Sequence, residues 1–377
     1  MNLKSNPIFK DKEFLISHIK SIMRFYHPRC IDNENGGFFQ HFRDDGSVYD
    51  FDTRHLVSST RFIFNYSMAS IELDNDEYKD VIRHGIKYLR QFHLNTKTGS
   101  YAWILEGKDV QDSTNYCYGF AFVLLAYSTA LRAGILEAKD FIDETFDVME
   151  KHFWSKEHEL YSDEISADWQ VVSSYRGQNA NMHSCEALIM AFEATGSQKY
   201  LDRALIIAKN ICIRQASLAE GLIWEHYDSN WEINWVYNKD RPDDLFRPWG
   251  FQVGHLTEWA KLLLILERHV KEDWLLPRAQ ELFDDAIEMG WDAESEGLFY
   301  GFSPNGDICD KDKYFWVQAE SIAAAAVLAN RAGDDYYWEW YDRIWSYSWK
   351  HMIDHKYGAW FRILDSNNNK YDDLKSP

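Results

Sequence analysis

Residues 36–42 read Gly36-Gly37-Phe38-Phe39-Gln40-His41-Phe42, and a related phrase, a glycine followed by aromatic and apolar residues, returns along the whole chain. The phrase begins at positions 37, 99, 159, 221, 297 and 358, with a glutamate in place of the glycine at 159. Successive phrases are 60 to 62 residues apart, except for one step of 76. A period of this length indicates a supersecondary unit that the chain repeats six times.

Each period also contains two segments with the apolar spacing of amphipathic helices. The clearest are residues 116–133 and 139–153, 180–195 and 198–212, and 316–331 and 335–352. Most of the phrases continue into short strand patterns and turns such as Asp44-Asp45-Gly46, which are typical of hairpins. Because one helix pair cannot bury its apolar side alone, neighbouring pairs must stack. We predict an all-α fold, an (α/α)6 barrel of about twelve helices with short β-hairpins in the loops at one end. An open solenoid is the alternative.

Composition narrows the class of protein. No linker rich in Ser, Gly or Pro interrupts the 377 residues, so we expect a single domain over residues 1–377. Residues 1–9 lack the apolar segment of a signal peptide, and no apolar run approaches the ~20 residues of a membrane helix. Five cysteines without paired spacing predict a reduced, cytoplasmic protein. We expect no membrane partner, and a monomer or a homodimer.

The charge and the absence of certain motifs argue against three further classes of protein. The formal net charge of −20 argues against nucleic acid, whose phosphates require a basic surface. The chain has neither a glycine-rich phosphate loop nor a nucleophile elbow, so it offers no nucleotide site and no acyl-transfer serine.

Aromatic residues make up 16% of the chain, and some of them, such as Trp249 and Trp316, stand beside polar residues. Flat rings flanked by hydrogen-bonding groups suit sugars, although a role in the core is the simpler interpretation of any one Trp.

Two phrases place a glutamate three residues after a histidine, at His183 with Glu186 and at His255 with Glu258. Residues with this spacing share a helix face, so we expect each pair to act together. An imidazole is the usual general acid and base near neutral pH, and a neighbouring carboxylate fixes its tautomer. The alternatives are histidines that only fill a helix start, or a metal site. The phrases lack the second histidine of the H-E-x-x-H zinc motif, so we expect no metal.

Three other polar or aromatic residues lie near predicted helix starts. Arg54 precedes an apolar helix, where it would either pair with an acid or face the mouth of the barrel. Trp316 and Glu320 share one face of another helix at a spacing of four. A buried Trp beside a surface Glu is the alternative for that pair.

These phrases resemble the N-acylglucosamine 2-epimerase superfamily, and most of all its mannose isomerase and sulfoquinovose isomerase branch. The resemblance runs from about residue 15 to the end. It is carried by Thr53-Arg54-His55, Arg176-Gly177-Gln178-Asn179-Ala180-Asn181-Met182-His183, Phe246-Arg247-Pro248-Trp249-Gly250, Gly254-His255, Glu258-Trp259 and Trp316-Val317-Gln318-Ala319-Glu320. Residues 176–183 form the most specific phrase. The resemblance implies an (α/α)6 barrel with a central pocket that isomerises a sugar without metal or other cofactor.

The resemblance also implies roles for single residues. His255 would be one of two histidines that open the sugar ring and transfer the proton, with His183 and Glu258 beside it. Substrate-binding residues would be Arg54, Asn179, Trp316, Glu320, Arg247 and Trp249. In the family the second catalytic histidine follows the last glycine phrase, whereas this sequence ends at Pro377 and His355 precedes that phrase. We expect a further C-terminal segment to carry it; a natively shorter chain would put the two-histidine mechanism in doubt.

The function expected from the resemblance is an aldose–ketose isomerase. It would interconvert D-mannose and D-fructose, and related sugars such as D-lyxose, through a cis-enediol. A sugar 2-epimerase differs only in where one proton returns and is the first alternative. A glycoside hydrolase that uses Glu258 and Glu320 across a cleft is the second. A regulatory protein that binds a sugar or a nucleotide without chemistry is the third.

Overall fold

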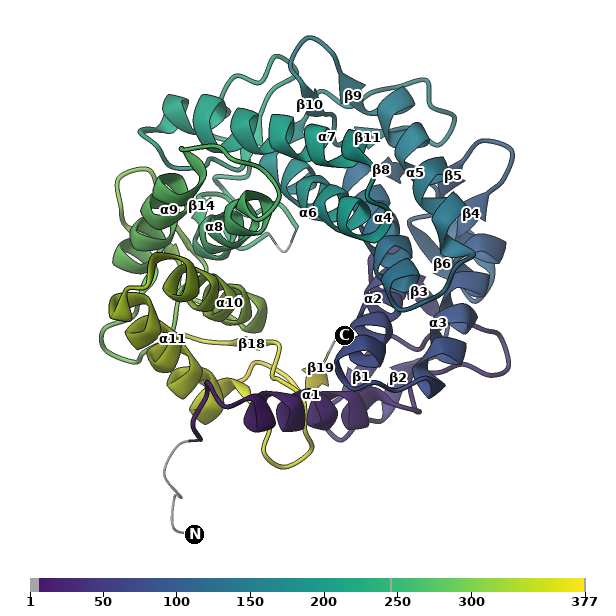
Figure 1. Cartoon of the computed structure of the whole chain (residues 1–377), viewed down its shortest axis with the longest axis horizontal. Coiled ribbons are helices and arrows are strands. Elements are labelled where there is room, and N and C mark those ends of the chain that lie inside the picture. The colour runs from purple at the N-terminus through teal and green to yellow at the C-terminus, as the bar shows by residue number, and fades with distance from the viewer. Residues whose placement is uncertain (1–6, 245, 376–377) are drawn as a thin grey trace.

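The computed structural model describes residues 7–244 and 246–375, and within them eleven α-helices form two concentric layers (Figure 1). The inner layer consists of α2 (Leu56–Glu72), α4 (Cys117–Arg132), α6 (Gln178–Thr195), α8 (Val253–Glu267) and α10 (Phe315–Ala332). The outer layer consists of α1 (Lys12–Tyr26), α3 (Glu77–Tyr88), α5 (Ala138–His152), α7 (Gln198–Lys209), α9 (Leu275–Gly290) and α11 (Asp335–Tyr347). The (α/α)6 barrel is confirmed, with eleven helices in the described part of the chain instead of about twelve.

The helices predicted from apolar spacing are confirmed to within one or two residues at most ends. Residues 198–212 and 335–352 were each expected to be one helix. In the structure α7 continues as the π-helical segment η2 (Asn210–Gln215), and α11 continues as η4 (Ser348–Met352). The outer helix α3 ends in the same way, in η1 (Leu89–His93). A wider last turn is therefore a repeated feature of the outer layer.

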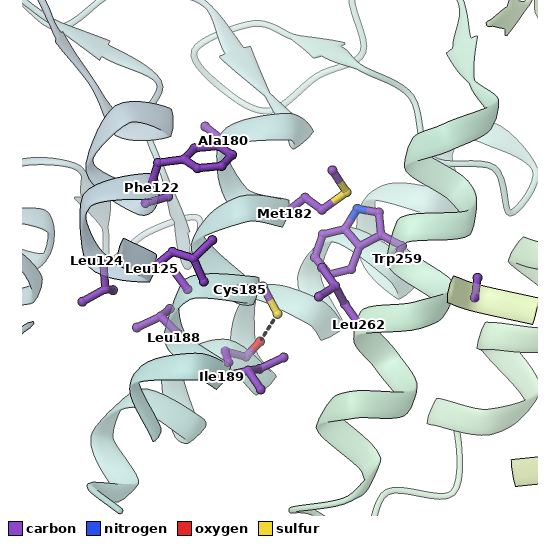
Figure 2. Packing of buried hydrophobic residues seen from close by; sticks show 14 of the residues in the cluster. Phe122, Leu124, Leu125, Ala180, Met182, Cys185, Leu188, Ile189, Trp259 and Leu262 are labelled. Atoms are coloured by element: carbon purple, nitrogen blue, oxygen red, sulfur yellow. Dashed lines mark hydrogen bonds between the residues drawn. The ribbon is translucent and has the colours of Figure 1, made fainter. Parts of the chain in front are cut away.

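The two layers differ in how they bury side chains. Inner helix α4 is buried along nearly its whole surface, because it packs against α2 and α6 on either side and against α5 behind. The outer helices are amphipathic and expose one face. Figure 2 shows side chains that fill the space between the inner helices: Phe122, Leu124, Leu125, Ala180, Met182, Cys185, Leu188, Ile189, Trp259 and Leu262.

Five of the six glycine phrases form a small antiparallel turn after an outer helix. The paired residues or strands are Ile31 with Phe38, β4 (Leu94–Asn95) with β5 (Ser100–Tyr101), β9 (Trp154–Ser155) with β10 (Leu160–Tyr161), Trp291 with Leu298, and Ile353 with Trp360. The fourth phrase, which begins at Gly221, instead follows the 3-10 turn η3 (Ala216–Ala219). Glycines at positions 37, 99, 221, 297 and 358 have positive φ, which a side chain rarely tolerates.

A second set of strands joins each repeat to the next. A strand directly before an inner helix pairs with a strand of the following repeat. These pairs are β3 (Thr53–His55) with β6 (Ile104–Glu106), β8 (Asn115–Tyr116) with β11 (Glu164–Ile165), β12 (Arg176–Gly177) with β13 (His226–Tyr227), β14 (Phe251–Gln252) with β15 (Gly301–Phe302), and β17 (Lys313–Tyr314) with β18 (Ile363–Leu364). Three further strands, β2 (Val48–Asp50), β7 (Asp109–Asp112) and β16 (Ile308–Asp310), complete hairpins. All lie in the outer-to-inner connections, hence at one end of the barrel, as predicted.

The ring is closed, which rules out the open solenoid. Strand β19 (Leu374–Lys375), near the end of the chain, pairs with β1 (His41–Arg43) of the first repeat. In Figure 1, α1, β18 and β19 lie between α10 and α2 and complete the circle. Among the described residues, no helix is both long and apolar enough to span a membrane.

Candidate active site

Three consecutive inner helices begin at the hairpin end of the barrel, and their first two turns carry most of the predicted site residues. His183 is the sixth residue of α6. His255 and Glu258 are the third and sixth residues of α8, as expected for a histidine in the first turn. Trp316 and Glu320 are the second and sixth residues of α10. Strands β12, β14 and β17 lead directly into these helices, so the strands fix where each helix starts.

A buried network surrounds one nitrogen of His255. Its Nδ1 lies 2.9 Å from Oε1 of Glu225, a residue just before β13, and 3.0 Å from Nε2 of Gln178. The same Gln178 Nε2 lies 3.2 and 3.0 Å from the two carboxylate oxygens of Glu225. The indole N–H of Trp259 donates to Oε1 of Gln178 at 2.7 Å. All four side chains are buried.

This network assigns the tautomer of His255. An indole nitrogen only donates, so Trp259 fixes Oε1 of Gln178 on its own side and turns the amide N–H groups toward Glu225. The Glu225 carboxylate only accepts, and it lies closest to Nδ1 of His255. Nδ1 therefore carries a proton and donates it to Glu225, which leaves Nε2 to exchange protons with a ligand.

His183 lies in a second cluster at the same level of the barrel. Its Nδ1 is 3.2 Å from Oε2 of Glu186, which confirms the expected pairing within α6. The same atom is 3.8 Å from Oε1 of Glu258 on α8. The rings of Tyr118 and Phe122 pack against the imidazole with centroids 5.0 and 4.9 Å away. His183 is thereby held between two carboxylates and two aromatic walls.

Lys261, one turn beyond Glu258 on α8, joins the carboxylates of three inner helices. Its Nζ forms an ion pair with Glu320 of α10 and lies 3.9 Å from an oxygen of both Glu186 and Glu258. Burial, followed by the neighbouring charge of Glu320, raises the pKa of Glu258 to about 8. The hydrogen bond from His183 and the charge of Lys261 outweigh burial at Glu186 and lower its pKa. The cluster therefore holds one carboxyl group near its titration point at neutral pH.

His255 and Glu258 form no hydrogen bond or ion pair among the described residues, although they lie within electrostatic range of each other. The two residues are three apart on α8, but Nδ1 of His255 is already bonded to Glu225, which lies in the long connection between α7 and α8. Glu258 lies instead near His183 and Lys261, where it meets a positive charge. Contacts of α8 with the preceding connection and with α6 decide this geometry, and spacing along one helix does not encode them.

Trp316 covers the first turn of α8. Its ring centroid lies 5.2 Å from that of His255 and 5.8 Å from that of Tyr300. A β-carbon at Gly254 would lie 2.7 Å from Cη2 of Trp316, so glycine is required there by this close approach. The half-buried indole thus forms a wall beside the candidate catalytic imidazole.

Arg54 forms a buried ion pair, as one of its two alternatives predicted. Its Nη2 donates to Oδ2 of Asp32 at 2.9 Å, and the side chain is 1% exposed. The same arrangement recurs at Lys313 with Asp292, at 2.8 Å, and at Lys375 with Asp354, at 2.6 Å. A role of Arg54 in the architecture of the repeat therefore accounts for its burial, and its contact with a sugar stays a prediction.

The remaining predicted residues lie in different surroundings. Asn179, the second residue of α6, has a buried Oδ1 without a partner among the residues that the structure describes. Arg247 donates to Glu164 at 3.1 Å and stacks on Tyr175, at the rim. Trp249 donates to the carbonyl of Trp235 and lines a surface cavity of about 390 Å³. No side-chain hydrogen bond, ion pair or ring contact joins any of these three residues to His255 or His183 in the described part of the chain.

One group of side chains has the composition of a metal site. Ligand atoms of His183, Glu186 and Glu258 lie within 4.8 Å of one another. The ammonium of Lys261 lies beside both carboxylates and supplies a positive charge there. A dication in this place would be repelled by that ammonium, so the donor set fits a metal poorly.

Sequence reasoning missed Glu225, Gln178 and Lys261. A signal for Glu225 was present, because Glu225-His226-Tyr227 follows its glycine phrase as Gln40-His41-Phe42 follows the first one. Gln40 has a similar role, since it donates to Ser59 and accepts from the backbone of His55. The residue before the His-aromatic pair therefore reaches the start of an inner helix in both repeats.

Comparisons with known proteins identify the family of the chain and agree with its fold. The family model of N-acylglucosamine 2-epimerase (GlcNAc 2-epimerase) matches residues 37–377. A D-mannose isomerase of Marinomonas mediterranea is 58% identical over 374 residues, 99% of this chain and 94% of that protein. One from Pseudomonas cannabina pv. alisalensis is 31% identical over 363 residues, 94% of this chain and 86% of that protein. A crystal structure of a D-mannose isomerase matches with a TM-score of 0.97 at 57% identity, covering 99% of this chain and 95% of that one.

Proposed function

The chain belongs to the N-acylglucosamine 2-epimerase family, and on this premise we propose that it is an isomerase that interconverts D-mannose and D-fructose. The observation that carries the proposal is the 58% identity to a D-mannose isomerase over nearly the full chain. A sugar isomerase must move one proton between C1 and C2. The His255 network supplies a buried imidazole with one free nitrogen for this purpose.

The proposed reaction begins with the ring closed. A protonated imidazole of the site gives its proton to the ring oxygen as the bond between C1 and that oxygen breaks, and the same imidazole takes up the proton of the C1 hydroxyl, so the open aldehyde forms. Nε2 of neutral His255 then takes the proton from C2 while the first imidazole protonates the C1 oxygen, which gives the cis-enediol. Nε2 of His255 returns its proton to C1, the first imidazole takes the proton of the O2 hydroxyl, and the ketose is complete with both imidazoles as they began. Glu225 stabilises the imidazolium that exists between these steps.

The other residues of the site bind the sugar in this proposal. His183 and Glu258 face each other across α6 and α8 and offer a donor and an acceptor for hydroxyl groups. Glu320 and Asn179 extend this polar surface, and Trp316 offers an apolar face to the C–H groups of the ring. Arg54, Arg247 and Trp249 remain proposed sugar contacts on the family resemblance alone.

We propose further that the reaction needs no metal, since Lys261 already supplies positive charge to the carboxylate cluster. The five cysteines are all free, which suits a reducing compartment such as the cytoplasm. A monomer or a homodimer remains our expectation for the state of assembly.

Proton NMR of D-mannose in D2O with the purified protein and EDTA tests this function. We expect the signals of D-fructose to grow, with little deuterium at C1 if one shielded base transfers the proton directly. Glucose as the first product would make the protein a 2-epimerase instead. Release of reducing sugar from a mannan would favour a hydrolase, and loss of activity in EDTA would contradict the metal-free mechanism.

A further inference from the structure

His226 joins three segments of the chain at the hairpin end of the barrel, beside the network around His255. It is the first residue of β13, directly after Glu225, and it is 1% exposed. Its Nε2 lies 2.7 Å from the carbonyl oxygen of Pro248, and its Nδ1 lies 2.9 Å from the hydroxyl oxygen of Tyr175. A carbonyl only accepts, so Nε2 carries the proton and donates it, and Nδ1 accepts from the phenol of Tyr175. Burial lowers the pKa of His226, which keeps the imidazole neutral.

Each of the three segments supplies one member of the buried network. The phenol belongs to the segment before β12, which leads into Gln178 at the start of α6. The carbonyl belongs to the segment before β14, which leads into His255 on α8. The imidazole itself follows Glu225 in the chain. A single buried side chain therefore links the segments that carry the catalytic histidine, its carboxylate partner and the amide that contacts both.

The link matters because the strands alone do not connect the three segments. β12 pairs with β13, and the backbone N–H of Gln178 donates to the carbonyl of Glu225 at 3.2 Å. β14 belongs to a different sheet, with β15 and β16, and no backbone ladder of the described strands joins it to β13. The hydrogen bond from His226 to the carbonyl of Pro248 crosses this gap. It fixes the start of α8 relative to the carboxylate that His255 contacts.

The phenol of Tyr175 is itself held by its neighbours. It lies over Gly177, where a β-carbon would be 2.7 Å from the phenol oxygen, so a larger residue there would displace it. The guanidinium of Arg247 lies 4.0 Å from the centre of the Tyr175 ring, and the ring of Tyr237 packs 4.8 Å away. The donor to Nδ1 of His226 is thus fixed in position.

The corresponding histidine of the first repeat, His41, has different surroundings. It follows Gln40 as His226 follows Glu225. Its half-buried imidazole forms no hydrogen bond with the described residues, and its Nδ1 lies 3.8 Å from Oδ2 of Asp50. The two hydrogen bonds of His226 are therefore not a requirement of the repeat, and they occur where the chain supplies Glu225 to the network.

We propose that His226 is a positioning residue for the isomerisation, which acts by holding Glu225 and Gln178 against Nδ1 of His255. The inference rests on the proposed isomerase function and deepens it. His226 does not bind the sugar, because it is buried and both of its nitrogens are occupied. Its contribution comes from geometry, since a misplacement of about 1 Å in an active site can lower the rate by about 10²-fold.

Two variants remove the link by different routes, His226→Leu and Tyr175→Phe. kcat and KM are measured for D-mannose, together with the free energy of unfolding. We expect kcat to fall by about 10–100-fold in His226→Leu and by about 3–10-fold in Tyr175→Phe, with KM within about twofold of the wild type, because no sugar contact is lost. His226→Gln should recover most of the loss, since an amide can donate to Pro248 and accept from Tyr175. His41→Gln is the matched control and should leave both constants unchanged.

A double-mutant cycle separates positioning from a general loss of stability. If His226 acts through Glu225, His226→Leu costs little in a protein that already carries Glu225→Gln, so the double variant keeps a kcat within about threefold of Glu225→Gln alone. A merely structural effect would multiply the two losses. Multiplied losses, or an unchanged kcat in folded His226→Leu, would overturn the proposal. Tyr175→Phe keeps the aromatic ring and gives the same cycle if His226→Leu does not fold.

Proton NMR of the imidazole N–H groups tests the positioning without turnover. The Nδ1–H of His255, hydrogen-bonded to a carboxylate, should give a resonance far downfield that is missing in His255→Asn. We expect this resonance to shift or broaden in His226→Leu and to persist in His41→Gln, and an unchanged resonance in both would overturn the proposal. If the wild type does not isomerise D-mannose, the proposed function has failed, and the resonance still decides whether His226 positions His255.

Discussion

His255 combines a carboxylate partner on one nitrogen with a free second nitrogen, and this arrangement makes it the main candidate for proton transfer. We expect His255→Asn to lower kcat by about 10²–10⁴-fold, the usual contribution of a general acid–base group. Fructose formation measures the loss, and thermal unfolding shows whether the fold is kept. His355→Gln is the control, since His355 lies at an outer-surface cavity. Activity within a few-fold of the wild type would remove His255 from the mechanism.

Glu225 acts through His255 and is a positioning residue. Glu225→Gln keeps an acceptor near Nδ1 but removes the charge that stabilises the imidazolium. We expect kcat to fall by about 10–100-fold while KM changes little, because no sugar contact is lost. Steady-state kinetics separate the two constants. An increase in KM with unchanged kcat would instead place Glu225 in the binding of the sugar.

Glu258 should make stability depend on pH. Burial, together with the nearby Glu320, raises its folded-state pKa to about 8, above that of the unfolded chain. The folded state therefore binds more protons than the unfolded state between the two values, so this group contributes stability at low pH that is lost as the pH rises toward 8. We expect Glu258→Gln, which is always neutral, to gain about 1–3 kcal/mol relative to the wild type between pH 5 and pH 8. Unfolding in denaturant at several pH values measures this, and an equal difference at every pH would contradict it.

The sequence indicated which residues matter more reliably than it indicated their partners. His183, His255, Glu258, Trp316 and Glu320 stand in the first two turns of their helices, which spacing and turn residues predicted. The partner of His255 lies 30 residues earlier, in the connection between α7 and α8, and the spacing of residues within α8 does not encode that contact. The role of Lys261 could not be predicted either, because the sequence around a lysine on an apolar helix does not indicate which carboxyl groups will lie beside it.

At the scale of the element, α8 contributes a histidine, a carboxylate and a lysine to one face of the inner layer. Lys261 neutralises carboxylates from α6, α8 and α10, so these helices depend on its charge. We expect Lys261→Met to destabilise the protein by about 3–5 kcal/mol, since it leaves buried carboxylates unpaired. Denaturant unfolding measures the loss. Lys271→Met, at an exposed position, is the matched control. Equal stability of the two variants would show that the carboxyl groups of the cluster do not need the charge of Lys261.

The sequence predicted the helices better than it predicted the short strands. Apolar spacing gave helix ends within a residue or two, because both layers bury apolar faces. Apolar spacing did not separate η2 and η4 from the helices that they follow, because a π-helical turn keeps nearly the same apolar pattern. The two-residue strands before the inner helices were equally hard to find, since their partners lie in the next repeat.

At the scale of the whole molecule, closure of the ring lets six similar repeats share one interior. Strand β19 meets β1, so the last repeat completes the first. Three of the repeats also share an ion pair, in which an aspartate near the glycine phrase binds a basic residue near the end of the next hairpin. The aspartate in each case also accepts two backbone N–H groups of its own turn. The basic residue is arginine in the first repeat and lysine in the other two.

This symmetry predicts the behaviour of Arg54. Because lysine occupies the equivalent position twice, we expect Arg54→Lys to remain within about 1 kcal/mol of the wild type in unfolding free energy. Arg54→Met would leave Asp32 buried and unpaired and should cost about 3–5 kcal/mol. Similar destabilisation by both variants would contradict a shared architectural pair. Kinetics of the stable Arg54→Lys protein then test the role implied by the family resemblance. If the guanidinium group of Arg54 contacts the sugar, the substitution lowers kcat/KM. If Arg54 serves only the architecture of the repeat, kcat/KM is unchanged.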